Sequence, residues 1–132
     1  MALSKLSSSR VTAQIYRATH ARKEVITIDA LFVINAVFQT GQIVATRGVY
    51  DLTCQNPDFA QFIQKCLNRH VKGEWGDVDD EDKQTNDQAL KQGTRLLSAY
   101  NDDRFPKQGV ATIWIITEAD RSATTILFPD EY

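Results

Sequence analysis

The sequence has few of the residues and patterns that mark specialised classes of protein. Only two of its 132 residues are cysteines, Cys54 and Cys66, which excludes a disulfide-stabilised scaffold. The longest apolar run, residues 30–38, is interrupted by Asn35 and is far shorter than the roughly 20 residues that span a bilayer. The first residues lack the apolar stretch of a secretory signal. We therefore expect a cytoplasmic protein with no membrane partner.

Short strings that mark common catalytic folds are also absent. The sequence has no Walker A, G-x-G-x-x-G, G-x-S-x-G or H-E-x-x-H string, so nucleotide-binding, α/β-hydrolase and zincin folds have no local support. The two cysteines do not form a C-x-x-C pair, and His20 and His70 lie far from them in sequence. The sequence thus predicts no cofactor and no metal ion.

What is present has the composition of an ordinary globular domain. Hydrophobic residues make up 42% and charged residues 24%, with a net charge of −2. We expect a Ser-rich tail over residues 1–10 and a single domain over residues 11–132.

The charged residues are unevenly distributed along the chain. Residues 1–73 have nine Lys and Arg against four Asp and Glu, whereas residues 74–132 have six Lys and Arg against thirteen Asp and Glu. Mutual attraction of the two halves explains this best; contact of the basic half with an anionic polymer is the alternative.

The first half of the chain predicts short strands and one ambiguous segment. Alternation and β-branched residues favour strands over 11–16, 25–28 and 43–45. Residues 30–40 are apolar on every side, and a helix between Asp29 and Gly41 or a buried strand fits them equally well. A short helix follows Thr46 and runs to Cys54.

The clearest element is an amphipathic helix over residues 57–70. Asn56 is a good N-cap and Pro57 suits the first helical position. Its apolar face has helical spacing and consists of Phe59, Phe62, Ile63, Cys66, Leu67 and His70.

The second half predicts a mostly exposed helix and three strands. A loop over residues 73–78 leads to an acidic helix start, and the helix covers residues 80–92, ending at Gly93. The strands span residues 94–100, 111–118 and 123–128. Both faces of the second strand are apolar, which is typical of a covered central strand. The predicted fold class is α+β: a helix–loop–helix segment packed on an antiparallel sheet that ends in a three-stranded meander.

Residues 41–132 contain several distinctive motifs. They are Trp75-Gly76-Asp77, Asn86, Leu96-Leu97-Ser98-Ala99-Tyr100, the run Trp114-Ile115-Ile116-Thr117-Glu118-Ala119-Asp120-Arg121-Ser122-Ala123-Thr124-Thr125, and the ending Pro129-Asp130-Glu131-Tyr132. With these motifs, the chain resembles a family of small bacterial proteins described as plasmid-related or hypothetical. In that family a proline follows the Val-Ala-Thr strand, whereas this chain has Arg47 there. The resemblance implies a mobile-element setting in bacteria and no particular reaction.

Polar and aromatic residues next to predicted loops, without a catalytic motif, favour a non-enzymatic module that binds a protein or a nucleic acid. The predicted binding surface consists of Arg69, His70, Trp75, Asp77, Asp120 and Arg121. Trp114, flanked by isoleucines, is expected in the core.

Two alternative functions belong to different classes. A small metal-independent ribonuclease would use His70 and Glu118 as acid and base, with Arg95 or Arg121 stabilising the phosphorane. Each of these residues also has a structural interpretation: His70 closes an apolar stripe, and Glu118 and Arg121 flank a turn. A self-associating structural protein is the third possibility.

Overall fold

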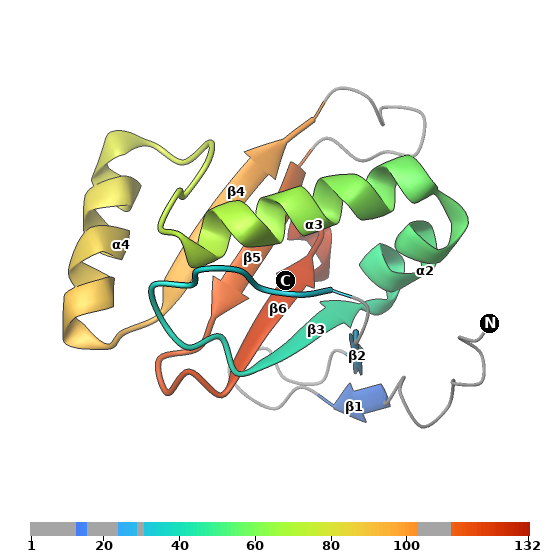
Figure 1. Ribbon diagram of the computed structural model, residues 1–132, viewed down its shortest axis with the longest axis horizontal. Helices are drawn as coiled ribbons and strands as arrows, with labels where there is room; N and C mark the ends of the chain where they lie inside the picture. Colours follow the sequence, from blue (N-terminus) through green and yellow to red (C-terminus); the bar gives the residue numbers. More distant parts are fainter. Residues whose placement is uncertain (1–12, 16–23, 29–30, 103–111) are drawn as a thin grey trace.

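The computed structural model describes residues 13–15, 24–28, 31–102 and 112–132. The predicted tail of residues 1–10, most of the basic N-terminal segment and His20 lie outside the described residues. Along the described chain, three strands are followed by three α-helices and then by three more strands. This segregated order is typical of an α+β protein and confirms the predicted fold class (Figure 1).

Six strands form one sheet, and its last three strands are the predicted meander. They are β1 Ala13–Ile15, β2 Glu24–Thr27, β3 Gln42–Thr46, β4 Leu96–Asn101, β5 Thr112–Thr117 and β6 Ala123–Leu127. The strand order is β1-β2-β3-β6-β5-β4. Neighbours β4, β5 and β6 pair antiparallel, which confirms the meander.

One pairing differs from the predicted antiparallel sheet. β3 runs parallel to β6, with Ile43 opposite Thr124 and Ala45 opposite Ile126, so the sheet is mixed. The pairing joins segments separated by more than half of the chain, and no local pattern encodes such a long-range neighbour. β5 has a neighbouring strand on each side, β4 and β6, as predicted for the central strand of the meander.

The α-helices lie on one face of the sheet and beside its β4 edge. α2 and α3 lie over one face, and α4 stands next to β4 (Figure 1). A short 3-10 helix, η2, ends the chain. Their bounds are α2 Arg47–Gln55, α3 Pro57–Val71, α4 Asp80–Gln92 and η2 Pro129–Glu131.

The two longer helices begin and end where the sequence predicts. The Asn56 side chain accepts hydrogen bonds from the Asp58 and Phe59 amides at the start of α3. The Asp79 carboxylate accepts one from the Asp82 amide at the start of α4, and Gly93 closes α4 in the left-handed conformation. α3 buries its whole predicted apolar stripe, whereas α4 buries little.

Residues 31–40 form neither the predicted helix nor the alternative strand. They run as an irregular segment along α3, where the Gln64 amide bonds both the N–H and the C=O of Phe32. Gly41 is not a helix stop: its positive φ lets it pass so close to Ser122 that a Cβ would lie 2.3 Å from that backbone. Tertiary contacts override the ambiguous local preference here.

The main core lies between the sheet and helices α2 and α3. β5 turns Ile113, Ile115 and Thr117 toward these helices, and all three are fully buried. Trp114 and Ile116 alternate with them and point to the other face. Trp114 is only half-buried there, so the expectation of a core tryptophan is wrong for that side of the strand.

Candidate functional site

The Trp75-Gly76-Asp77 motif covers the exposed edge of β4. The Ala99 amide donates to the Trp75 carbonyl at 3.2 Å, and the Asp77 amide donates to the Ala99 carbonyl at 2.6 Å. The Asp77 carboxylate also accepts a hydrogen bond from the Asn101 amide at 2.9 Å. Asp77, predicted in a binding surface, thus pairs with backbone groups that an edge strand would otherwise expose.

Only glycine fits the middle of this motif. Gly76 has a φ of +79°, and a Cβ there would lie 2.1 Å from the Ala99 carbonyl oxygen and 2.6 Å from the Tyr100 ring. The close approach is needed because the loop pairs with β4 as a strand would.

Asn86 continues the cover of β4 toward the start of the strand. Its amide nitrogen donates to the Leu97 carbonyl at 2.7 Å, and its amide oxygen accepts from the Leu97 amide at 3.1 Å. The side chain is buried on α4. Asn86 therefore joins α4 to the sheet with the hydrogen bonds of a neighbouring strand.

Replacing Asn86 with alanine should lower the free energy of unfolding by about 1–3 kcal/mol, because the Leu97 N–H and C=O lose their partners. Urea denaturation gives this number, and hydrogen exchange of the Leu97 amide should become much faster. Gln88→Ala, an exposed change on the same helix, should stay within about 0.5 kcal/mol of the wild type. Unchanged protection of Leu97 would contradict the edge-covering role.

Trp75 does not lie on the surface that the sequence predicted for it. Its side chain is 4% exposed and packs with Ala89 and Leu96 in a second apolar cluster under α4. The indole N–H donates to the Asp87 carboxylate at 2.9 Å. The ring joins α4 to the sheet, and the Trp75 indole is not available for a partner.

His70 is also buried, and both ring nitrogens have partners. Nδ1 lies 2.5 Å from the Ser98 hydroxyl, and Nε2 lies 2.9 Å from the Thr117 hydroxyl. The Phe38 and Trp75 rings approach the imidazole edge-on, with centroids 5.4 and 5.7 Å away. His70 therefore links α3 to β4 and β5 inside the core.

The hydrogen bonds around His70 fix its tautomer. The Thr124 hydroxyl must donate to the Thr40 carbonyl, so it accepts from the Thr117 hydroxyl. Thr117 in turn accepts from Nε2–H of His70, which leaves Nδ1 as an acceptor for the Ser98 hydroxyl. In the neutral imidazole, this chain of donors places the proton on Nε2.

The electrostatic environment keeps this ring neutral. Burial, and then the nearby charge of Arg121, lower the pKa of His70 from 6.5 to about 3. At neutral pH the ring is not the imidazolium that acts as a general acid, and its basic nitrogen Nδ1 is buried and hydrogen-bonded to Ser98. These properties do not suit the catalytic role that the ribonuclease hypothesis requires.

Arg121 connects three pieces of backbone. It has a positive φ of 60° in the β5–β6 turn, and its guanidinium donates to the carbonyls of Thr94, Glu118 and Ala89. Ala89 belongs to the last turn of α4, where a cation is favourable. In the same turn, hydrogen bonds with the Ser122 side chain and then with the Ser122 amide lower the pKa of Asp120. Arg121 thus fixes the hairpin against α4.

Arg69 lies near the opposite end of β4 from Arg121. Its Nε is 3.5 Å from Glu74 Oε1, and its guanidinium lies 4.9 Å from the Tyr100 ring centroid. Tyr100 and Thr94 are six residues apart along an extended chain, so the two arginines are separated by about 20 Å. The six residues of the predicted binding surface therefore do not gather in one place.

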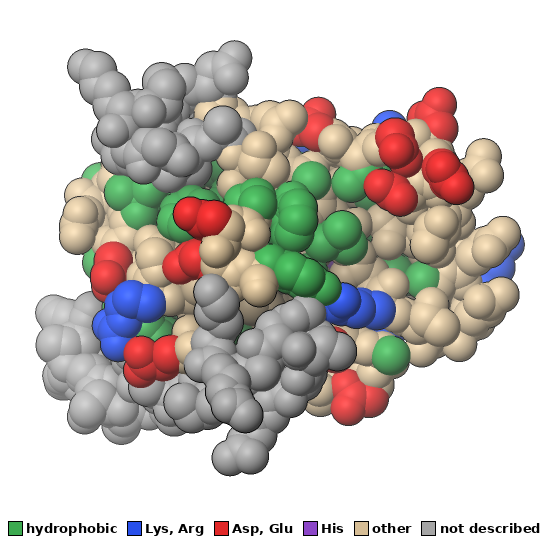
Figure 2. Space-filling view, turned by 180° about the vertical axis from the view of Figure 1, so that it is seen from behind, with side chains coloured by type: hydrophobic (Ala, Val, Ile, Leu, Met, Phe, Trp, Pro, Cys, Tyr) green, Lys and Arg blue, Asp and Glu red, His purple; other side chains and the backbone are tan. Residues whose placement is uncertain are grey.

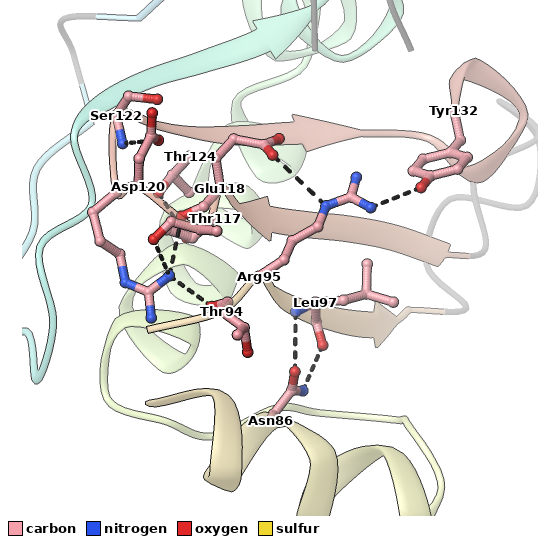
Figure 3. A network of polar contacts seen from close by, with 12 residues as sticks. Asn86, Thr94, Arg95, Leu97, Thr117, Glu118, Asp120, Ser122, Thr124 and Tyr132 are labelled. Carbon is pink, nitrogen blue, oxygen red and sulfur yellow. Dashed lines mark hydrogen bonds and ion pairs between the residues drawn. The ribbon is translucent and has the colours of Figure 1, made fainter. Parts of the chain in front are cut away.

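The proposed ribonuclease residues also do not converge. Thr117 and Glu118 are consecutive, so their side chains point to opposite faces of the sheet. Thr117 contacts His70 on the helical face, whereas Glu118 lies 3.8 Å from Arg95 on the other face (Figure 3). The sheet stands between the intended acid and base.

Arg95, Glu118 and Tyr132 form a cluster on the face opposite α2 and α3. Arg95 Nη1 donates to the Tyr132 hydroxyl at 2.9 Å, and its guanidinium lies 5.5 Å from that ring centroid (Figure 3). The second oxygen of Glu118 is buried without a hydrogen-bond partner among the described residues. Burial, and then Asp120, raise the pKa of Glu118.

An apolar groove of about 330 Å³ lies beside this cluster. Trp114 and Tyr132 meet edge to face along it, with ring centroids 5.6 Å apart, and Tyr132 is 45% exposed. Figure 2 shows hydrophobic side chains gathered in the middle of this face, with acidic side chains toward the α4 side. The groove is lined by Asp82, Thr85, Asn86, Arg95, Leu97, Trp114, Ile116 and Tyr132.

Sequence reasoning missed most of the groove. The signal lay in the alternation of β5, where Trp114 and Ile116 put large apolar side chains on the face opposite Ile113 and Ile115. Apolar residues on both faces of β5 predict that both faces are covered. The row that contains Trp114 and Ile116 was therefore expected in the core. Only the positions of the helices show that this row lies on the face opposite α2 and α3, where Trp114 stays half-buried and Ile116 is buried.

The described chain gives no sign of a membrane-spanning helix or a metal centre. None of its helices combines the length and the apolar character that a bilayer crossing requires. Among the described residues, no three His, Cys, Asp or Glu side chains are grouped so that they could hold a metal ion. Comparisons with protein-family models, curated proteins and solved structures found no match, so the resemblance to plasmid-related proteins stays a prediction.

Proposed function

We propose that this protein is a non-catalytic interaction module that binds a partner protein through the groove on the sheet face opposite α2 and α3. The observation that supports this is the groove itself: a half-buried tryptophan and two aliphatic side chains line it together with residues of α4. Aromatic anchors in such depressions contribute most of the binding energy at many protein interfaces.

The charge around the groove favours a protein over a nucleic acid. Arg95 already contacts the Glu118 carboxylate and the Tyr132 hydroxyl. The neighbouring α4 has three acidic residues in its first turn, which repel phosphate groups. Following the resemblance to plasmid-related proteins, we place the partner in the cytoplasm of a bacterium that carries a mobile element.

Replacing Trp114 with threonine should reduce partner capture at least about 10-fold, because the anchor is lost while the strand keeps a β-branched residue. Wild-type and variant proteins would be used for affinity capture from a bacterial lysate, followed by quantitative mass spectrometry. Phe32→Thr is the matched control, since Phe32 is 57% exposed and lies beside α3. It should leave capture unchanged.

Three results would contradict the proposal. Equal capture by wild type and Trp114→Thr would show that the groove is not the binding surface. Loss of capture after nuclease treatment would show a nucleic-acid partner. Capture of only the protein's own chain, with light scattering showing a Trp114-dependent oligomer, would support the self-associating alternative instead.

A further inference from the structure

Two charged side chains that line the groove, Arg95 and Asp82, differ in how available they are to a ligand. Arg95 Nε lies 3.8 Å from Glu118, and Arg95 Nη1 donates to the Tyr132 hydroxyl. Its positive charge is therefore balanced by a carboxylate on the same face. Asp82 also lines the groove, and its carboxylate is exposed and has no hydrogen-bond or ion-pair partner within the described chain.

Residues next to Asp82 strengthen the negative potential on the α4 side of the groove. Asp79, Asp80 and Glu81 precede it in the same turn of helix, and Lys83 is the one cation within this turn. Figure 2 shows acidic side chains on the α4 side of this face. A ligand in the groove therefore meets apolar surface on the floor and negative charge on the α4 side.

The apolar floor of the groove suits a side chain with a long aliphatic stem. Leu97 and Ile116 provide aliphatic surface, and Trp114 and Tyr132 provide aromatic rings. Long cationic side chains bury their methylene groups on such surfaces while the charged end stays in water or meets an acid. Aromatic rings add attraction for that charged end.

We infer that the groove takes an arginine or lysine side chain from a basic, apolar segment of the partner, with the stem over Leu97 and Ile116 and the charged end near Asp82. This inference rests on the proposed function and specifies the chemistry of the partner. A volume of about 330 Å³ is at the lower end of the range for ligand sites, which fits one long side chain.

Three small probes with the same ring but different charge test this directly. Benzamidine is cationic, benzyl alcohol is neutral and benzoate is anionic. Each would be titrated into the labelled full-length protein and followed by NMR at the Trp114 indole N–H and the Leu97 and Ile116 methyl groups. We expect benzamidine to bind at least about 5-fold more tightly than benzyl alcohol, and benzoate to bind most weakly.

Matched variants locate the source of the charge preference. Asp82→Asn should reduce benzamidine affinity to that of benzyl alcohol, and added salt should have the same effect. Glu118→Gln should also weaken benzamidine, because the charge of Arg95 would no longer be balanced. Asp58→Asn removes the same charge from an exposed position in the first turn of α3 and should change nothing.

The outcomes separate this inference from the proposed function. Equal affinity for benzamidine and benzyl alcohol at the groove, or a preference for benzoate, would overturn the inference and leave an apolar binding groove. If no probe shifts the groove resonances, both proposals fail. A benzamidine preference that survives Asp82→Asn but disappears in Asp58→Asn would place the cation elsewhere and overturn the inference.

Discussion

Replacing Trp75 with alanine should lower the free energy of unfolding by about 3–5 kcal/mol, a large share of the stability of a domain this size. The side chain is 4% exposed and fills the cluster under α4, so its removal leaves a cavity there. The Asp87 carboxylate would also lose its indole donor. Urea denaturation followed by far-ultraviolet circular dichroism measures the change without relying on tryptophan fluorescence.

Trp75→Phe separates the contribution of apolar packing from that of the hydrogen bond to Asp87. Phenylalanine keeps most of the apolar surface but lacks the N–H that Asp87 accepts, so a loss of about 1–3 kcal/mol is expected. If Trp75→Ala weakened partner capture and left the unfolding transition in place, the residue would belong to an interaction surface, as the sequence alone had suggested. A large loss of stability places it in the core.

The second large effect is a pH dependence that comes from His70. In the unfolded chain the imidazole binds a proton below about pH 6.5, whereas in the folded protein it does so only near pH 3. Between these values the unfolded state binds more protons, so stability falls as the pH falls. The His70 contribution is fully present above pH 6.5 and decreases by about 1.4 kcal/mol per pH unit below it.

His70→Gln isolates this contribution. The variant lacks the titrating ring, so the stability advantage of the wild type should shrink as the pH is lowered from 7 to 4. His20 is present in both proteins, so its own contribution cancels. NMR of the imidazole carbon-bound protons provides a direct measurement: the His70 signals should not titrate above pH 4. Titration near pH 6.5 would contradict the buried hydrogen-bond chain.

Most helices and strands could be predicted because their signals are local. Asn56 and Pro57 mark the start of α3, and Asp79 and Gly93 mark the two ends of α4. A cap depends on side chains within three or four residues, and an amphipathic stripe depends on spacing within one helix. The β4–β5–β6 meander follows equally from short strands and a tight turn.

The roles of the conspicuous residues could not be predicted in the same way. Trp75, Asp77 and Arg121 looked like surface residues because each lies in or next to a loop. Each instead contacts an element distant in sequence: Asp87 for Trp75, β4 for Asp77, and the end of α4 for Arg121. A loop residue that satisfies a buried backbone group has the same local sequence as one that binds a ligand.

By itself, the sequence determined the α+β class, the limits of the longer helices and the meander, because these depend on neighbours along the chain. Only the tertiary structure decided that β3 pairs parallel with β6, that residues 31–40 follow α3 as an irregular segment, and that His70 and Glu118 lie on opposite faces. It also decided which apolar row of β5 packs against α2 and α3. Alternation along β5 places the Trp114 and Ile115 side chains on opposite faces of the sheet. The packing of α2 and α3 selects which of these faces becomes the core.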